Sequence, residues 1–392
     1  MRVLAITKIF PNAAEPLSAP FNRQQFAALG KRCDLEVMAT IPWFPGAGLL
    51  ARWSSAGKLA AVPRHEQIAG IAVSHPRTLF VPRLAHGAWG PLYAASIAPV
   101  MRHYRGKIDV VLGSWAYPDG FAAIIAARIL GVPCVVKLHG SDINVMAKLP
   151  APRRWLAWAL PQAASVVAVS RPLADEVALL GVPRDRIAIV MNGVDAELFR
   201  PRDRAAARRE LGLPAGPLAL YVGNLKEEKG VLDLPRAWDL VARDLPDATL
   251  AIVGGGPLRP AMEAALPPRA TLFGPQPLAS IPTWLAACDV LVLPSHIEGT
   301  PNVVLEALAC GRRVVASAVG GVPDVLTSPT LGTLVPPRAP EQFAAALTQA
   351  LRTPYVPEAV AELGARGGWD ASAAALHDVL AAAAGASVRS SR

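Results

Sequence analysis

The sequence predicts an α/β protein built from two doubly wound domains, each a parallel sheet with helices on both faces. A chain of 392 residues is too long for one ordinary hydrophobic core, so two domains are the natural expectation. Short apolar runs of strand length alternate with helical patterns, and this alternation is typical of parallel sheets. The same rhythm occurs in the first half of the chain and again in the second.

The first half opens with an expected strand over Arg2–Thr7, followed by an irregular loop over 8–19 and a helix over 22–29. A second strand is expected over Asp34–Ala39. The later elements of this half are strands over 109–113, 133–138 and 164–170 and a helix over 120–130. Each expected strand is apolar and is followed by turn residues or a helix, as a parallel sheet requires.

The second half carries five more apolar runs of strand length. They cover 217–222, 248–253, 270–273, 290–293 and 313–316. The charged, proline-bearing stretch over 199–204 is the expected boundary, which divides the chain into domains 1–198 and 199–392. Alanine-rich residues 371–384 predict a closing helix of the second domain, with Gly385 just past its end and 387–392 as a frayed tail.

Composition limits the function classes. The chain is 52% hydrophobic, yet no apolar run reaches the roughly 18 uncharged residues of a bilayer-spanning helix. The N-terminus enters a strand instead of resembling a signal peptide, so a cytoplasmic protein is expected. The four cysteines are scattered without the spacing of a zinc site or a disulfide framework, and are expected to be reduced core thiols.

The net charge of +9 is concentrated in the first half. Residues 1–190 carry 21 Lys and Arg against 10 Asp and Glu, whereas the remainder carries 18 against 20. Such a surface could attract a phosphate-bearing substrate or an anionic membrane; no nucleic acid is expected, because the aromatic pattern of a base-stacking surface is missing. Arg153 and Arg154 beside Trp155 and Trp158 fit either an interfacial membrane helix or a core-packed helix with a charged start.

Residues 295–311 contain two carboxylates eight positions apart at a strand-to-helix junction. Thr300 is the expected N-cap and Pro301 the first-turn residue, which places Glu298 in the loop and Glu306 about 9 Å along the helix. One carboxylate could hold the hydroxyls of a sugar and the other a ribose, with a phosphate at the helix N-terminus between them. The alternative is a solvated loop residue and an ordinary surface residue, but Glu306 interrupts an apolar stretch and needs a partner there.

Three other segments follow expected strands. Lys229 beside the flexible Gly230 could reach a diphosphate, or lie in a solvated loop. The glycine-rich turn over 252–257 could let the backbone approach a ligand, or serve only as a tight turn. His139 and Asp142 follow a strand of the first domain, where they could face a cleft between the domains, or the imidazole could cap its own loop.

These motifs, with Asn192-Gly-Val-Asp195 and the glycine-containing segment over 319–324, together resemble the family 4 glycosyltransferases of the GT-B fold. The resemblance covers almost the whole chain. It implies two Rossmann-like domains facing across a cleft, the first on the acceptor side and the second binding a nucleotide sugar. It also implies a hexosyltransferase that moves a sugar with retention from a nucleoside diphosphate sugar to an acceptor hydroxyl, with no metal and no cofactor beyond the donor substrate.

The resemblance further implies roles for individual residues. His139 would approach the sugar near its reacting face, Lys229 would neutralise the leaving diphosphate, and Glu298 would bind the sugar hydroxyls, so these three are the expected catalytic residues. Glu306 would bind the ribose. The remaining expected substrate-binding residues are Asp142, Asn224, Gly255, Gly299, Thr300 and Asn302.

Two positions depart from the family pattern. The family has an arginine five residues before Lys229, where this chain has Asn224, which can donate a hydrogen bond but carries no charge. Lys226 and the helix dipole are candidates to compensate. The segment over 7–25 is similar to the acceptor-side opening of members that build bacterial cell-surface polysaccharides, but Ala19 replaces a usual glycine, and its Cβ could narrow the acceptor site or alter the loop.

The leading hypothesis is therefore a transferase that extends a glycan or lipid-linked acceptor in exopolysaccharide, capsule or other surface-glycan assembly, peripheral to an anionic membrane at the inner face of a bacterial cell. A first alternative is a non-catalytic sugar-nucleotide-binding partner of such an assembly, motivated by Asn224. A second is a nucleotide-sugar epimerase on the same fold, which would need acid–base groups at the sugar ring; His139 and Glu298 form the one evident pair.

Overall fold

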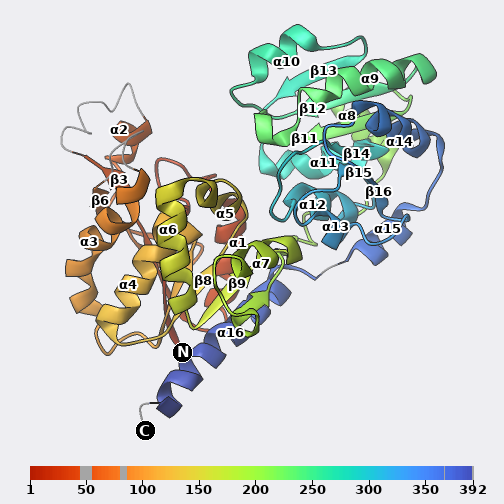
Figure 1. Cartoon of the computed structure of the whole chain (residues 1–392). Helices are drawn as coiled ribbons and strands as arrows, with labels where there is room; N and C mark the ends of the chain where they lie inside the picture. The colour runs from red at the N-terminus through yellow and green to blue at the C-terminus, as the bar shows by residue number, and fades with distance from the viewer. Residues whose placement is uncertain (45–54, 80–85, 366, 391–392) are drawn as a thin grey trace. The chain divides into compact units, whose positions relative to one another are not determined.

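The structure, a computed structural model, describes residues 1–44, 55–79, 86–365 and 367–390 (Figure 1). The chain divides into two compact units. Unit 1 comprises Met1–Asn192 and Trp369–Arg392, and unit 2 comprises Gly193–Gly368. The boundary between the units thus lies between residues 192 and 193, before the charged stretch over 199–204 where it was expected. The last segment, Trp369–Arg392, belongs to unit 1. None of the helices in the described ranges is both long and apolar enough to cross a bilayer.

Unit 1 is built on an eight-stranded sheet with the order β10-β9-β8-β7-β1-β2-β5-β4. The strands are β1 (Arg2–Thr7), β2 (Asp34–Ala39), β4 (His65–Ile68), β5 (Ile71–Ser74), β7 (Val110–Ser114), β8 (Cys134–Lys137), β9 (Ser165–Ala168) and β10 (Ile187–Ile189). All neighbours pair in parallel except β4 and β5, which form an antiparallel pair. β3 (Ile41–Trp43) and β6 (Arg77–Leu79) form a separate parallel pair.

Helices cover both faces of this sheet, because alternate residues of β1 point in opposite directions. Leu4 and Ile6 pack in one core and Val3 and Ala5 in the other. The principal helices of the unit are α1 (Pro20–Gly30), α3 (Trp89–Met101), α4 (Phe121–Leu130), α6 (Pro150–Ala159), α7 (Arg171–Ala178) and α16 (Trp369–Ser390), with the short α2 (Ser55–Leu59) and α5 (Ser141–Asn144). α3, α4 and α6 supply residues to the first core, and α1 and α16 to the second.

The closing helix corrects the expected domain assignment. α16 carries Ala373, Leu376 and Leu380 on one stripe, and all three are buried in the core shared with Phe26 of α1. The helix therefore completes unit 1, although its sequence position suggested the second domain. It also continues through Gly385, which the sequence placed beyond its end.

Unit 2 contains a six-stranded, wholly parallel sheet with the order β13-β12-β11-β14-β15-β16. Its strands are β11 (Leu218–Val222), β12 (Thr249–Val253), β13 (Ala270–Gly274), β14 (Val290–Leu293), β15 (Arg313–Ser317) and β16 (Gly332–Val335). Its helices are α8 (Arg204–Leu211), α9 (Asp233–Asp244), α10 (Arg259–Ala265), α11 (Ile281–Ala287), α12 (Asn302–Ala309), α13 (Val322–Val325), α14 (Pro340–Arg352) and α15 (Pro357–Gly364). The two doubly wound sheets match the expected architecture.

Candidate functional site

Four loops of unit 2 meet at the edge of the sheet where its parallel strands end. They follow β11, β12, β14 and β15, and cover 223–230, 254–258, 294–301 and 318–321. We call them the carboxyl-edge loops. Open parallel sheets bind their ligands at this edge, and Lys229, Glu298 and the glycine-rich turn all lie on these loops.

The glycine-rich turn is pressed against the loop after β11. Leu225 donates its N–H to the Gly255 carbonyl at 2.9 Å, and its own carbonyl accepts from Leu258 N–H at 3.0 Å. A Cβ on Gly254, whose φ is 146°, would lie 1.8 Å from the Gly223 carbonyl oxygen, so no side chain fits there. The structure thus gives these glycines a packing role, and contact between Gly255 and a substrate stays a prediction.

The loop carrying Lys229 is fixed to the loop carrying Glu298. The Glu228 carbonyl accepts from the N–H groups of His296 and Ile297 at 2.9 and 3.1 Å. Gly230 has a φ of 59°, and a Cβ there would lie 2.0 Å from the Pro294 carbonyl oxygen. These backbone contacts hold the loops of Lys229 and Glu298 close together independently of any attraction between the two side chains.

Lys229 and Glu298 form an ion pair. The ammonium lies 2.8 Å from Oε1 and 2.9 Å from Oε2 of the carboxylate, and Ser295 Oγ donates to Oε1 at 2.6 Å. Glu298 is only 7% exposed, so the solvated-loop interpretation of this residue is wrong. Ser295, which the sequence analysis did not single out, donates to the same carboxylate because it lies three residues before Glu298 on the same loop.

The loop over 318–321 packs against the backbone of Glu298 and Gly299. Gly321 donates its N–H to the Gly299 carbonyl at 2.8 Å, and a Cβ on Gly320 would lie 2.0 Å from the Glu298 carbonyl oxygen. Gly299 is therefore used through its backbone oxygen within the protein. Its expected contact with a substrate stays a prediction.

Helix α12 begins one residue later than expected. Pro301 is the N-cap, and its carbonyl accepts from Val304 N–H at 3.0 Å; the expected cap, Thr300, lies outside the helix. Proline has no N–H to leave unsatisfied, which suits it to this boundary. Asn302 occupies the first helical position, at the positive end of the helix dipole.

Glu306 lies in the middle of α12 and is half-buried. Its carboxylate has no hydrogen-bond or ion-pair partner among the residues that the structure describes, and burial raises its pKa to about 7. A buried carboxylate without a partner is costly to ionise. A ligand that donates hydrogen bonds to it would reduce that cost. Glu306 is thus a partly buried carboxylate on α12, and its contact with a ribose stays a prediction.

Asn224, one of the two positions that depart from the family pattern, is exposed. Asn224 lies on the solvent side of its loop, with its carbonyl accepting from the Tyr221 hydroxyl at 2.9 Å. Lys226 is exposed too, with its ammonium 3.9 Å from a Glu228 oxygen.

The sequence analysis missed His296, whose Nε2 lies 2.8 Å from Asp233 Oδ2 beside the Lys229 loop. Its position two residues before Glu298 was the signal that could have identified it.

In unit 1, Asp142 organises the loop after β8. Its carboxylate is fully buried and accepts from the N–H groups of Ala116 and Gly140, both at 2.8 Å, and of His139 at 3.1 Å. His139 Nε2 lies 2.9 Å from Ser114 Oγ, and burial lowers the pKa of the imidazole well below its ordinary value, which favours the neutral form. The imidazole thus faces Ser114, and it is Asp142 that caps the loop.

Two buried charges in unit 1 escaped the sequence analysis. Lys137 is fully buried at the end of β8, where burial lowers its pKa to about 7, and its ammonium donates to Gln25 Oε1. Asp119 is equally buried, and burial raises its pKa to about 7. The signal for Lys137 was the one that marked Glu306, a charged residue within an apolar run.

Comparisons with known proteins identify the family of the chain. The family model described as "Glycosyltransferase Family 4" matches residues 10–198, and "Glycosyl transferases group 1" matches 216–353. The putative teichuronic acid biosynthesis glycosyltransferase TuaC of Bacillus subtilis is 30% identical over 355 residues, covering 89% of each chain. A D-inositol 3-phosphate glycosyltransferase of Frankia alni is 34% identical over 302 residues, covering 69% of this chain and 73% of its own.

The fold is also found in solved structures. The HepE protein of Anabaena, crystallised with UDP, superposes with a TM-score of 0.68 at 19% identity, over 100% of this chain and 99% of its own. The sucrose-phosphate synthase of Thermosynechococcus elongatus superposes with a TM-score of 0.71 at 20% identity, over 98% and 96% of the two chains. With two Rossmann-like units, a full-length relative at 30% identity and a family model over each half, the chain belongs to the family 4 glycosyltransferases of the GT-B fold.

Proposed function

We propose that the protein is a retaining, metal-independent hexosyltransferase that takes its sugar from a nucleoside diphosphate sugar bound at the carboxyl-edge loops. The observation that carries the proposal is the ion pair of Lys229 and Glu298, held by backbone contacts beside the N-terminus of α12. A cation, a hydrogen-bonding carboxylate and a helix N-terminus are the groups that a sugar diphosphate needs. Support comes from HepE, which was crystallised with UDP-glucose.

Each residue has a proposed task. Lys229 and the N–H groups at the start of α12 neutralise the leaving diphosphate, Glu298 accepts hydrogen bonds from the sugar hydroxyls, and Glu306 accepts from the ribose. The bond from the anomeric carbon to the diphosphate breaks, the acceptor oxygen bonds to that carbon on the same face, and the acceptor proton passes to the departing phosphate. The neutral His139 is the proposed contribution of unit 1 near the sugar.

The proposed acceptor is a glycan or lipid-linked molecule of a bacterial surface polysaccharide, met at an anionic membrane from the cytoplasmic side. TuaC is named for teichuronic acid biosynthesis, which supports the polymer class. The first 190 residues carry the excess of positive charge. On α6, Arg153 and Arg154 are exposed and Trp158 is 43% exposed, while Trp155 is half-buried against Phe121, so this helix combines core packing with an amphipathic outer surface.

The donor is identified by a thermal-shift screen of nucleoside diphosphates and their sugars, followed by assays of nucleotide release with and without lipid extract. Release that needs acceptor supports the transferase, and NMR of the anomeric proton of the product then reports retention or inversion. Activity in excess chelator tests metal independence. Stabilisation by a donor that no acceptor turns over would instead support the binding partner suggested by Asn224.

The membrane proposal is tested separately by flotation with vesicles containing anionic lipid. Retention at low salt and release at high salt are expected. The double change Arg153→Glu/Arg154→Glu should abolish retention, whereas the matched control Arg236→Glu/Arg243→Glu on α9 should retain it. Equal flotation of both variants, or none of the unaltered protein, would contradict membrane binding through α6.

A further inference from the structure

A cavity of unit 2 lies at the edge of the sheet where strands begin. It has a volume of about 670 Å³, within the range of small-molecule sites. Asp289 directly precedes β14 and Arg312 directly precedes β15, so the cavity is at the amino ends of these strands, opposite to the carboxyl-edge loops. The other wall is formed by residues of the segment 350–358, which contains the end of α14, the connection after it and the start of α15.

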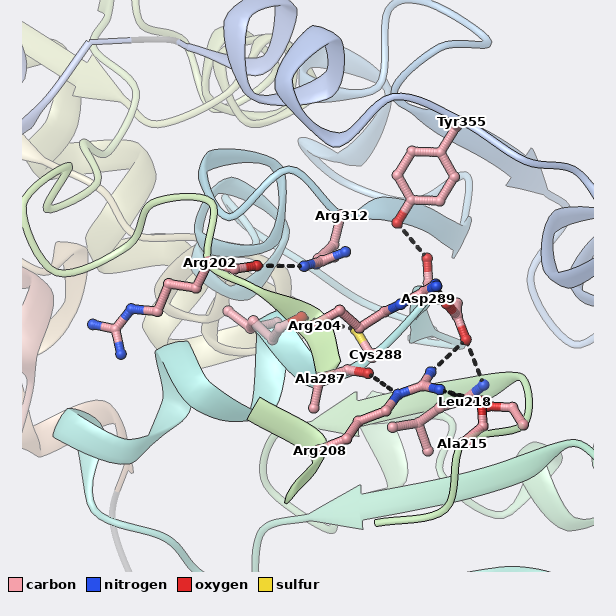
Figure 2. A network of polar contacts seen from close by, with 12 residues as sticks. Arg202, Arg204, Arg208, Ala215, Leu218, Ala287, Cys288, Asp289, Arg312 and Tyr355 are labelled. Atoms are coloured by element: carbon pink, nitrogen blue, oxygen red, sulfur yellow. Dashed lines mark hydrogen bonds and ion pairs between the residues drawn. The ribbon is translucent and has the colours of Figure 1, made fainter. Parts of the chain in front are cut away.

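Arginines outnumber carboxylates by one on the cavity wall. Arg202, Arg204, Arg312 and Arg352 line it, against the carboxylates of Asp203, Asp289 and Glu358. The aspartates are already engaged within the protein. Asp203 Oδ1 accepts from Ala206 N–H at 2.6 Å as the N-cap of α8, and Asp289 pairs with Arg204 and, at 2.7 Å, with Arg208 (Figure 2).

Arg312 is the unusual member of this group. It is 3% exposed, its Nη2 donates to the Arg202 carbonyl at a long 3.3 Å, and its Nε has no hydrogen-bond partner among the described residues (Figure 2). Its protein partners are neutral: that carbonyl and the hydroxyl of Tyr355. No carboxylate of the described ranges forms an ion pair with it.

Burying a guanidinium without an opposite charge is unfavourable. A neighbouring carboxylate does not offset the charge, because the Asp289 oxygens are taken up by Arg204, Arg208 and the Leu218 N–H. The wall therefore keeps a positive charge that a bound anion would compensate. Guanidinium groups bind phosphate through paired, charge-assisted hydrogen bonds.

We infer that this cavity is a second binding site, separate from the candidate donor site, for a small phosphate-bearing anion held by Arg312 with the surrounding arginines. The size of the cavity suits a phosphorylated metabolite larger than phosphate itself. Because the cavity and the carboxyl-edge loops occupy opposite edges of one sheet, the two sites can be tested independently. α12 runs between them, from Asn302 toward Arg312.

The test is calorimetry of the full-length protein with inorganic phosphate and pyrophosphate, using chloride of equal ionic strength as the reference. It is done in the Lys229→Ala protein, so that the candidate donor site contributes least. Saturable binding is expected, and Arg312→Met, which keeps the apolar stem of the side chain, should weaken it at least tenfold. Binding no tighter than chloride, or unchanged by Arg312→Met, would overturn the proposal.

A second variant avoids the buried arginine. Thr353 is exposed on the cavity wall, so Thr353→Glu adds a repelling carboxylate without altering the core. It should also weaken phosphate binding at least tenfold, whereas the matched control Thr271→Glu, on β13, should not. Equal affinity in the two proteins would contradict the assigned site even if Arg312→Met failed to fold.

Discussion

Both carboxylate oxygens of Glu298 accept from the Lys229 ammonium, at 2.8 and 2.9 Å. The pair joins the loop after β11 to the loop after β14, and the Glu228 carbonyl would hold the same two loops together without it. The charges are thus placed by the backbone and not by their mutual attraction. A diphosphate can therefore compete for Lys229 without dismantling the site.

The two carboxylates of the motif should separate catalysis from binding. We expect Glu298→Ala to abolish transfer while changing nucleoside diphosphate affinity by less than about threefold, because its proposed contacts are to the sugar. Glu306→Ala should weaken that affinity at least tenfold, the loss expected for hydrogen bonds to a charged group. Calorimetry with the diphosphate found in the donor screen measures both, and the reverse pattern would exchange the two roles.

Glu306 should also make the stability of the protein depend on pH. Burial raises its pKa from 4.5 to about 7, so ionisation is more costly in the folded than in the unfolded state. The cost is absent below pH 4.5, grows between pH 4.5 and 7, and is complete above pH 7. Relative to the unaltered protein, Glu306→Gln should gain roughly 1–3 kcal/mol between pH 5 and pH 8.

Urea unfolding at the two pH values measures this gain. The exposed Glu341→Gln on α14 is the matched control, and its effect should stay within about 0.5 kcal/mol at both values. A Glu306→Gln effect that is equal at pH 5 and pH 8 would mean that the carboxyl titrates normally.

Asp142 should be required for the fold of its loop. Its two oxygens accept from three backbone N–H groups, and an asparagine amide would turn a donor toward one or more of them. We expect Asp142→Asn to lower the free energy of unfolding by about 2–3 kcal/mol. The exposed Asp175→Asn on α7 should cost under about 1 kcal/mol, and similar losses in the two variants would contradict the capping role.

Ala19 adopts a left-handed conformation, with φ 43° and ψ 57°, immediately before α1. A Cβ in this region costs about 1–2 kcal/mol, partly offset by the greater entropy that glycine loses on folding. Ala19→Gly should therefore stabilise the protein by about 0.5–1 kcal/mol. Ala27→Gly, inside α1, should destabilise the protein by a similar amount, and thermal unfolding compares the two variants.

Much of the fold could be predicted because the central strands are encoded locally. β1, β2 and β14 occupy the residues expected from their apolar runs. The pair β4 and β5 was missed, since its strands are short and one is polar, as an edge allows. α16 was assigned to the wrong domain because an apolar stripe does not specify which sheet it covers.

The candidate site was predictable only where a residue contradicted its surroundings. Glu306 in an apolar helix was such a residue. Lys137 in an apolar strand was another, but the sequence analysis did not identify it. Ser295, His296 and the packing role of Gly254 depend on which loops meet at the edge of the sheet. Those contacts are made between segments far apart in the chain, and no local pattern encodes them.

The return of α16 to unit 1 has a consequence for synthesis on the ribosome. Gln25 donates to Ser372, 347 residues later, so the sheet that begins at Arg2 lacks one of its covering helices until the chain has been translated through α16. Unit 2 is a continuous segment and can fold before that moment. Unit 1, whose first strand is synthesised before any part of unit 2, is thus completed after unit 2, and until α16 packs, the apolar face that it covers is exposed to aggregation.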